Sequence, residues 1–179
     1  MAERASAHVW AMRVAFGALA LTIMFFHLIP LDTLPRRWAP PDLLLAFAFA
    51  WVLRRPEFVP PLLLAGIMLL ADLLFQRPPG LWALLVVLGA EYLKYRTAGL
   101  SEASFIGEWA AVALVVTGIT LLNRLILGIM MVPLPAFGLG VIQMVLTIVA
   151  YPLVALVTQA LMGVRRPTPG DAGAMGARG

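Results

Sequence analysis

Cysteine is absent from this chain of 179 residues, and charged side chains are scarce. Without cysteine the chain has no disulfide, no thiolate metal site and no cysteine nucleophile. Its histidines, His8 and His27, are expected near opposite faces of one span and lack the companions that a metal site needs. Charged residues make up 12% of the chain, against about 25% in a soluble domain.

Apolar residues, in contrast, make up 62% of the chain. A soluble domain of this length buries only about 70% of the surface that its unfolded chain exposes, so it could not hide so much apolar surface. We therefore predict an integral membrane protein, for which lipid is the solvent. The net charge of +4 then reflects Lys and Arg beside membrane spans and does not indicate nucleic-acid binding.

Six apolar blocks, separated by prolines and charged residues, predict six transmembrane helices at about 9–31, 41–53, 60–75, 81–93, 105–131 and 137–162. The first block is too long for a signal-peptide core and precedes no small-residue cleavage site, so we expect a retained span. The predicted fold class is an all-α membrane bundle. Residues 1–162 form its single six-helix domain, and 163–179 form a disordered cytoplasmic tail.

The Lys and Arg residues alternate between the two sides of these blocks. Nine are expected on one side and three on the other: Arg4, Arg13, Arg54, Arg55, Lys94, Arg96, Arg165, Arg166 and Arg178 against Arg36, Arg37 and Arg77. Because cytoplasmic loops carry an excess of Lys and Arg, this distribution predicts that both termini are cytoplasmic. An even number of spans agrees with that placement.

The second and third spans are short for a hydrocarbon core of about 30 Å. Two arrangements are open: a tilted helical pair that crosses a thin region, or a re-entrant hairpin. We favour the helical pair, with Arg54, Arg55 and Glu57 at the cytoplasmic turn, because it preserves the alternation of charge.

Asp42 and Asp72 lie near the outer ends of their spans, on the same side as Arg36, Arg37 and Arg77. An ionisable residue at membrane depth needs a partner or a water-filled cavity. We favour interfacial salt bridges and, for Asp42, a cap on the helix that follows. A charged periplasmic mouth or a partner contact is the alternative. Nothing near either carboxylate indicates acid–base catalysis, so we do not expect an enzyme.

Asn123 and Arg124 lie inside the fifth span, where a lipid-facing guanidinium is costly. Arg124 can extend past Met130 and Met131 to the interface. Alternatively, it faces the bundle and binds a carboxylate or a polar group of a partner. Both interpretations are open.

Simpler roles are expected for other residues. Glu91 and Lys94 are spaced for an i,i+3 pair. The tryptophans fall near predicted interfaces, as in an aromatic belt: Trp10, Trp38, Trp51, Trp82 and Trp109. Glycines within the spans permit close helix approach: Gly66, Gly89, Gly118, Gly138 and Gly140.

Several short motifs follow one another between residues 38 and 95. They are Pro41-Asp42-Leu43-Leu44-Leu45, then Arg54-Arg55-Pro56-Glu57, then Gly66 to Leu74 with Asp72 inside it, and Pro79-Gly80-Leu81. In this order they resemble the rod shape-determining protein MreD family of bacteria. Elsewhere the similarity is limited to the number and length of spans. Trp82 stands where the family commonly has a histidine.

The resemblance implies a non-enzymatic scaffold of the cell-elongation machinery in the bacterial inner membrane, without a cofactor. MreD-like proteins associate with MreC, a single-pass membrane protein with a periplasmic domain. Together they link MreB filaments to peptidoglycan synthesis by RodA and its transpeptidase partner. The family's fold is similar to the substrate-binding component of energy-coupling-factor transporters, although a shared fold does not carry transport over.

Two functions therefore remain open. A scaffold that binds the transmembrane helix of MreC predicts a groove of small and aliphatic residues. A vitamin-like ligand-binding component of a transporter predicts an outer cavity with convergent polar groups. The short outer loops favour the scaffold. The candidate structural or partner-contact residues are Pro41, Asp42, Arg54, Arg55, Glu57, Asp72, Gly80, Asn123 and Arg124.

Overall fold

The computed structural model describes residues 2–29, 39–98, 105–134 and 136–162, and the ordered elements in these ranges are all helical. They are α1 (Ala2–Leu28), α2 (Leu43–Arg54), the short 3₁₀ helix η1 (Pro56–Phe58), α3 (Pro61–Leu74), α4 (Leu81–Ala98), α5 (Phe105–Ile129) and α6 (Phe137–Met162). The expected disorder of 163–179, and the pairing expected for Arg36 and Arg37, fall outside the described residues.

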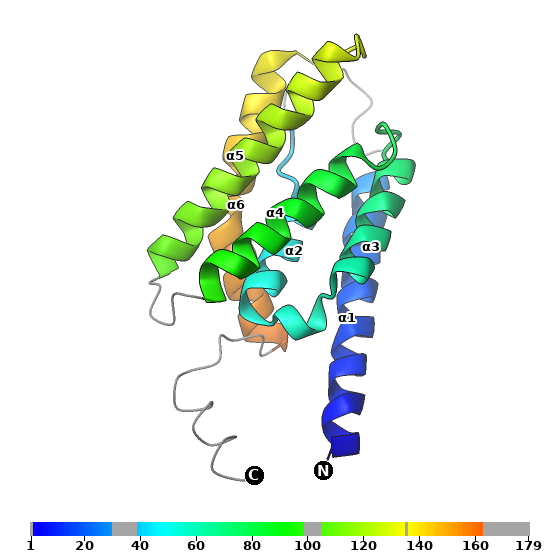
Figure 1. Cartoon of the computed structure of the whole chain (residues 1–179), viewed down its shortest axis with the longest axis vertical. Coiled ribbons are helices and arrows are strands. Elements are labelled where there is room, and N and C mark those ends of the chain that lie inside the picture. Colours follow the sequence, from blue (N-terminus) through cyan, green and yellow to red (C-terminus); the bar gives the residue numbers. More distant parts are fainter. Residues whose placement is uncertain (1, 30–38, 99–104, 135, 163–179) are drawn as a thin grey trace.

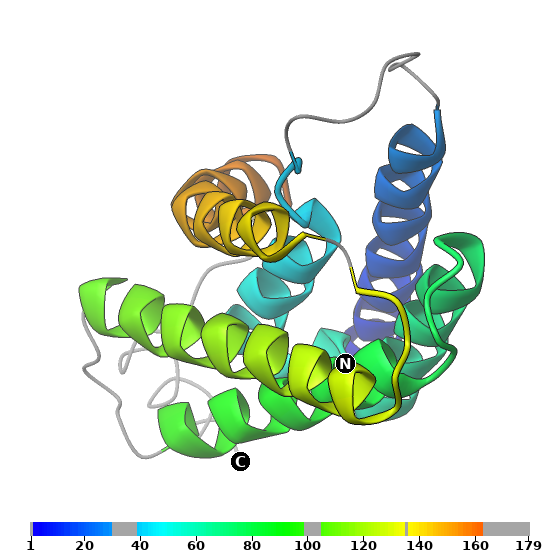
Figure 2. The same cartoon turned by 90° about the horizontal axis from the view of Figure 1, so that it is seen from above.

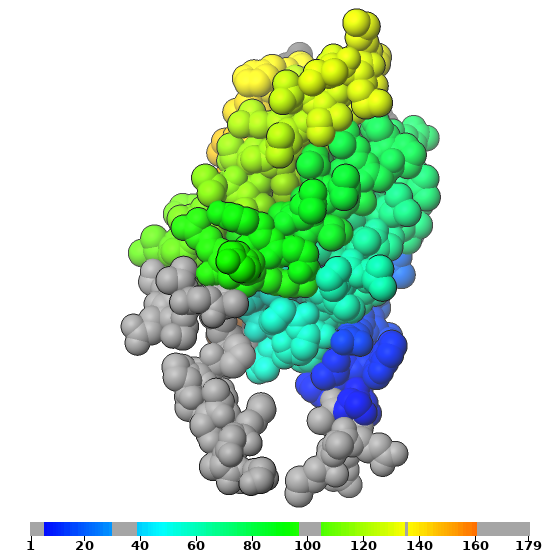
Figure 3. Space-filling model, viewed as in Figure 1, coloured from blue at the N-terminus to red at the C-terminus, as the bar shows by residue number. Residues whose placement is uncertain are grey.

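The six α-helices run alternately up and down, so the start of α1 and the end of α6 lie at the same end of the bundle (Figure 1). Seen from above, α2 lies inside the bundle, between α6 and α1 (Figure 2). It packs on α6, α4 and α1, while α3 packs on α4 and α1, and α5 packs on α4 and α6. In the space-filling view, α4 and α5 cover much of the face in front of α2 (Figure 3). The second helix is therefore the centre of the fold.

The central position of α2 explains its length. All of its residues from Leu44 to Arg54 are buried, and its 12 residues reach only about 18 Å at 1.5 Å per residue. A helix enclosed by protein need not match the thickness of the lipid, and irregular backbone beside it is tolerated for the same reason. The two short segments form the helices α2 and α3, joined by η1; that the pair crosses the membrane fully stays a prediction.

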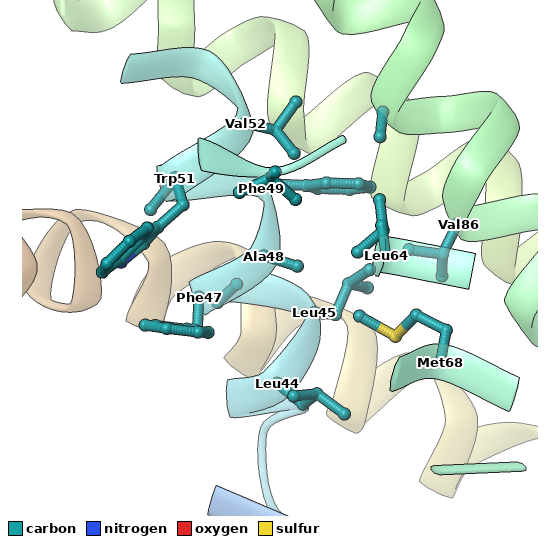
Figure 4. Packing of buried hydrophobic residues seen from close by; sticks show 14 of the residues in the cluster. Leu44, Leu45, Phe47, Ala48, Phe49, Trp51, Val52, Leu64, Met68 and Val86 are labelled. Carbon is teal, nitrogen blue, oxygen red and sulfur yellow. The ribbon is translucent and has the colours of Figure 1, made fainter. Parts of the chain in front are cut away.

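Apolar side chains on both sides of α2 form the core. Phe47 and Trp51 project to one side, while Leu45 projects to the other, toward Leu64 and Met68 of α3 (Figure 4). The Trp51 ring lies 5.5 Å from the Phe16 ring and 5.4 Å from the Phe47 ring. Trp51 is fully buried, so its predicted place in an interfacial aromatic belt is wrong. Because α2 lies inside the bundle, its last turns meet other helices and not lipid headgroups.

Three helices contain stretches long and apolar enough to cross a membrane: 6–28 in α1, 105–129 in α5 and 137–160 in α6. Only 17%, 22% and 17% of the residues in their most apolar windows are buried within the protein. Outward-facing leucines and valines on these helices would be unfavourable in water and suit lipid. The structure thus has the helices of a membrane protein, as the composition predicts.

Candidate functional site

A cavity of about 770 Å³ opens among the helices at the end of the bundle opposite the start of α1. Several segments contribute to its wall: the end of α1, the segment before α2, the α3–α4 turn, α5, the α5–α6 connection and α6. These segments lie around the end of the bundle that faces the viewer in Figure 2. Its described polar lining is His27, Asp42, Gln76, Arg77, Thr120, Asn123, Arg124, Gln143 and Thr147. These polar residues can be identified in the sequence, but only the structure shows that they line one cavity.

Asp42 anchors the start of α2 at the edge of this cavity. Its side chain accepts a hydrogen bond from the Leu45 amide at 3.0 Å, which is the predicted helix cap. Its own amide donates to Thr147 Oγ1 of α6 at 2.8 Å, and the Thr147 hydroxyl donates to the Gln143 carbonyl. Pro41, just before it, accepts a hydrogen bond from the Leu43 amide. Asp42 and Thr147 therefore fix the entrance of α2 against α6.

Arg77 supplies the salt bridge that the sequence predicts for Asp42. Its guanidinium lies 3.6 Å from the Asp42 carboxylate and packs over the rings of Phe75 and Trp82, at 5.3 and 5.2 Å from their centres. Such cation–π contacts hold a charged group in place where apolar groups surround it. His27 packs on the same Phe75 ring, with the ring centres 4.5 Å apart. The His27 ring is therefore packed against an aromatic ring in the cavity wall.

Arg124 faces the cavity, which decides between its two interpretations. Its guanidinium lies 5.1 Å from the centre of the Phe137 ring at the start of α6. A Cβ atom at Gly140 would approach Arg124 Nη1 to 2.9 Å, so this glycine makes room for the guanidinium. Asn123 lines the same wall. The Arg124 side chain thus turns toward α6 inside the bundle and does not extend past Met131.

Asp72 closes the α3–α4 turn. One carboxyl oxygen, Oδ2, accepts hydrogen bonds from the amides of Gly80 at 3.0 Å and Ala83 at 3.1 Å, so it satisfies donors in the first turn of α4. Gly80 has φ of +90°, a conformation that favours glycine. Oδ1 is buried with no hydrogen-bond partner in the described part of the chain. The Asp72 backbone carbonyl accepts from the Arg77 amide, so the same residue also positions the cavity arginine.

Arg54 takes part in a buried polar cluster at the other end of α2. It donates to the backbone carbonyl of Ala155 in α6 and lies 3.7 Å from the Glu108 carboxylate in α5. The Tyr151 hydroxyl donates to the same carboxylate. Arg54 lies at the end of α2 beside the α2–α3 turn, as predicted, but the residue is only 5% exposed. The acceptors on α5 and α6 hold its charge inside the bundle.

The α2–α3 turn itself is held by charged residues from other helices. Arg55 and Glu57 pair at 3.3 Å on the surface. Arg13 of α1 donates to the Glu57 carbonyl, and Lys94 of α4 donates to the Val59 carbonyl. Lys94 also forms the predicted pair with Glu91, at 2.7 Å. These contacts attach the turn to α1 and α4.

The structure divides the predicted residues into two groups at opposite ends of the bundle. Asp42, Asn123 and Arg124 line the cavity, with Pro41 next to Asp42 in the chain. Asp72 and Gly80 lie in the adjoining turn, whereas Arg54, Arg55 and Glu57 lie at the far end.

Sequence reasoning missed Thr147 as a partner of Asp42 and the cluster of Glu108 with Tyr151. An acidic residue within a predicted span was the signal available for Glu108. No comparable signal marked Tyr151.

In comparisons with protein-family models, curated proteins and solved structures, nothing matches this chain.

Proposed function

We propose that this chain is a non-enzymatic membrane scaffold of the bacterial cell-elongation machinery. The observation that supports it most is the behaviour of the motifs that resemble the MreD family. Asp42 caps α2, Arg54 joins α2 to α5 and α6, and Asp72 with Gly80 closes the turn before α4. The motif residues act together as the parts that hold the central helices in position, which is what a rigid membrane scaffold requires.

The proposed scaffold lies in the inner membrane, with six crossings and both termini in the cytoplasm. The alternating direction of the helices supports this placement (Figure 1), as does the excess of Lys and Arg expected on one side. The enclosed position of α2 allows a short helix to take part in such a bundle. The cavity then faces the periplasmic side.

The proposed partner is the transmembrane helix of MreC, with RodA, its transpeptidase partner and MreB in the wider assembly. In lipid, helices associate through close packing and a few polar contacts, since lipid tails are as apolar as leucine. The weakly buried outer faces of α1, α5 and α6 offer such surfaces. The proposal thus requires no bound small molecule.

Depletion of the chain in its own host tests this function. The scaffold proposal expects rod-shaped cells to become round as the protein is lost, and re-expression of the wild-type chain to restore rods. The variant Arg96→Gln, which alters only an exposed hydrogen bond to Tyr92, serves as the matched control and should also restore them. Cells that stay rod-shaped after the protein has disappeared would contradict the proposal.

A second candidate function is a ligand-binding component of a membrane transporter, and the cavity favours it. Its volume of about 770 Å³ is within the range of about 300–1,000 Å³ found for small-molecule pockets. It also has the convergent polar groups near the predicted outer face that this function requires. In the depletion experiment, this candidate expects loss of uptake of a nutrient and no change of cell shape.

A further inference from the structure

Three uncharged carboxamide side chains line the cavity from three different segments: Gln76 from the α3–α4 turn, Asn123 from α5 and Gln143 from α6. Asn123 and Gln143 are half-buried, while Gln76 is exposed and lies nearer the solvent. Within the described part of the chain, none of these three side chains forms a hydrogen bond. A carboxamide offers two donors and an acceptor, and in this wall they are available to a ligand.

The helix spacing turns Asn123 and Gln143 toward the cavity. Thr120 and Leu127, one turn to either side of Asn123 on α5, also line it. On α6, Thr147 lines it one turn after Gln143. Residues three or four positions apart share one face of a helix. Both carboxamides therefore belong to the cavity-facing sides of their helices.

Gln76 occupies a backbone position that favours glycine. Its φ is +53°. Its amide donates to the Leu73 carbonyl and the Arg77 amide donates to the Asp72 carbonyl, which is the Schellman ending of a helix. Glycine is the usual residue at this place because it has no Cβ. Here a glutamine takes the position, and its side chain lines the cavity, which points to a use of that side chain outside the turn.

The helix α5 ends in the same way at Met131, which provides a comparison. Met131 has φ of +56°, and the amides of Met131 and Val132 donate to the carbonyls of Gly128 and Leu127. The Met131 side chain is 91% exposed and is not among the described lining residues. The two turns thus share a backbone conformation and differ in whether the side chain lines the cavity.

The remaining wall indicates the class of ligand. Asp42 and Arg77 pair with each other, and apolar side chains such as Val116 and Met144 contribute to the wall. A carboxamide is matched best by a group that presents a donor beside an acceptor, as Asn and Gln show when they bind the edge of adenine. An amide has this arrangement. The volume of about 770 Å³ leaves room for an apolar body beside such a group.

We infer that the cavity binds an uncharged small molecule that carries an amide-type group on an apolar body. Asn123 and Gln143 are the main contacts, and Gln76 is a further contact nearer the solvent. The inference rests on the second candidate function, because it names the ligand class of the same cavity. Binding by the purified chain and nutrient uptake after depletion are separate readouts, so the inference and that function can fail independently.

Three probes with the same phenyl body test the inference. Hydrocinnamamide can donate and accept, benzylacetone has nearly the same shape but only accepts, and hydrocinnamate is an anion. Titration calorimetry would measure their affinities for the full-length chain in phosphatidylcholine nanodiscs. Asn123→Leu and Gln143→Met remove a carboxamide and keep a similar volume. Gln76→Gly removes the third, and Met131→Gly is its matched control in the corresponding turn.

We expect hydrocinnamamide to bind at least about threefold more tightly than benzylacetone, since a neutral hydrogen bond contributes roughly two- to tenfold in affinity. It should also bind more tightly than hydrocinnamate. Asn123→Leu and Gln143→Met should each reduce the preference for the amide. Gln76→Gly should weaken amide binding while it keeps or raises the midpoint of thermal unfolding. Met131→Gly should have the same effect on that midpoint and leave binding unchanged.

Hydrocinnamate binding as tight as that of the amide, or no saturable binding of the amide, would overturn the inference. So would a preference for the amide that Asn123→Leu, Gln143→Met and Gln76→Gly all leave unchanged. Equal weakening by Gln76→Gly and Met131→Gly would also contradict it, because the loss would then come from the backbone turn. If a helix variant does not fold, Gln76→Gly carries the test, since its turn favours glycine.

Discussion

Replacing Asp72 by alanine removes the acceptor shared by the amides of Gly80 and Ala83. The Ala83 amide is buried and would have no replacement, and such an orphaned donor costs about 1–3 kcal/mol. The Gly80 amide is only partly buried, so water can replace its bond at a smaller cost. Hydrogen bonds within membrane bundles average about 0.6 kcal/mol and reach about 1.7. We therefore expect Asp72→Ala to lower the free energy of unfolding by about 2 kcal/mol.

Asp72→Asn separates the loss of the acceptor from the loss of the side chain. Asparagine keeps a carbonyl oxygen where Oδ2 accepts both bonds, so its cost should be about 1 kcal/mol or less. The measurement is reversible unfolding in mixed micelles of increasing SDS content, followed by circular dichroism. Glu91→Ala is the matched control, because the Glu91 side chain is exposed in its i,i+3 pair with Lys94, and its loss should change the free energy of unfolding by about 0.5 kcal/mol or less.

The result that would refute this reasoning is an Asp72→Ala variant as stable as Glu91→Ala. In that case, the first turn of α4 would not depend on the remote carboxyl group. A second refutation would be an Asp72→Asn variant that unfolds as readily as Asp72→Ala, since the two differ in the acceptor that the structure identifies.

Three further changes have expected outcomes in the same unfolding assay. Gly89→Ala should destabilise by about 1–2 kcal/mol, because its Cβ would lie 2.8 Å from side-chain atoms of α5; Gly66→Ala, which meets nothing within 4 Å, should be neutral or stabilising by up to about 1 kcal/mol. Glu108→Ala should destabilise by about 3–5 kcal/mol, because it leaves the buried arginine at the end of α2 without its carboxylate. Trp51→Ala should lower the free energy of unfolding by about 3–5 kcal/mol, because it leaves a cavity in the core. Trp10→Ala removes an exposed ring and should lower it far less.

Each of these has a result that would contradict it. Equal effects of the two glycine substitutions would mean that α4 and α5 do not approach closely at Gly89. Glu108→Ala at wild-type stability would place the arginine in water instead of inside the bundle. A larger loss for Trp10→Ala than for Trp51→Ala would restore the interfacial interpretation of Trp51.

Helix positions were largely predictable from the sequence, because prolines and apolar runs determine them. The ends of α2, α3 and α6 agree with the predicted spans within two residues. The helices α1 and α4 extend beyond theirs, to Ala2 and to Ala98. Hydropathy reports where a chain meets lipid, while alanines and charged helix formers continue a helix into the polar region.

Contacts were predictable where they are local. The cap by Asp42 and the pair of Glu91 with Lys94 follow from residues three positions apart. The contact between Arg54 and Glu108 joins residues 54 positions apart, and only the packing of α2 against α5 and α6 brings them together. The cavity could not be read from the sequence for the same reason: its wall is assembled from separate helix ends.

Glycines show the same limit. Five were expected to permit close approach of helices, but only Gly89 and Gly140 have atoms near the place of a Cβ. At Gly89 the neighbours are side chains of α5 and α2, as expected, while at Gly140 the neighbour is the Arg124 guanidinium. At Gly66, Gly118 and Gly138 nothing lies within 4 Å, so the expectation was wrong there. Residue size gives the opportunity for a contact, and tertiary packing decides whether it is used.

The composition of the complex that this chain forms in its own membrane is the most direct test of the proposed function. Tagged protein would be extracted gently from native membranes and the intact assembly weighed by native mass spectrometry. The scaffold proposal predicts a near-stoichiometric single-pass membrane protein with a periplasmic domain, retained with the chain. Recovery of ATPase-type subunits and a small bound molecule in its place would contradict it.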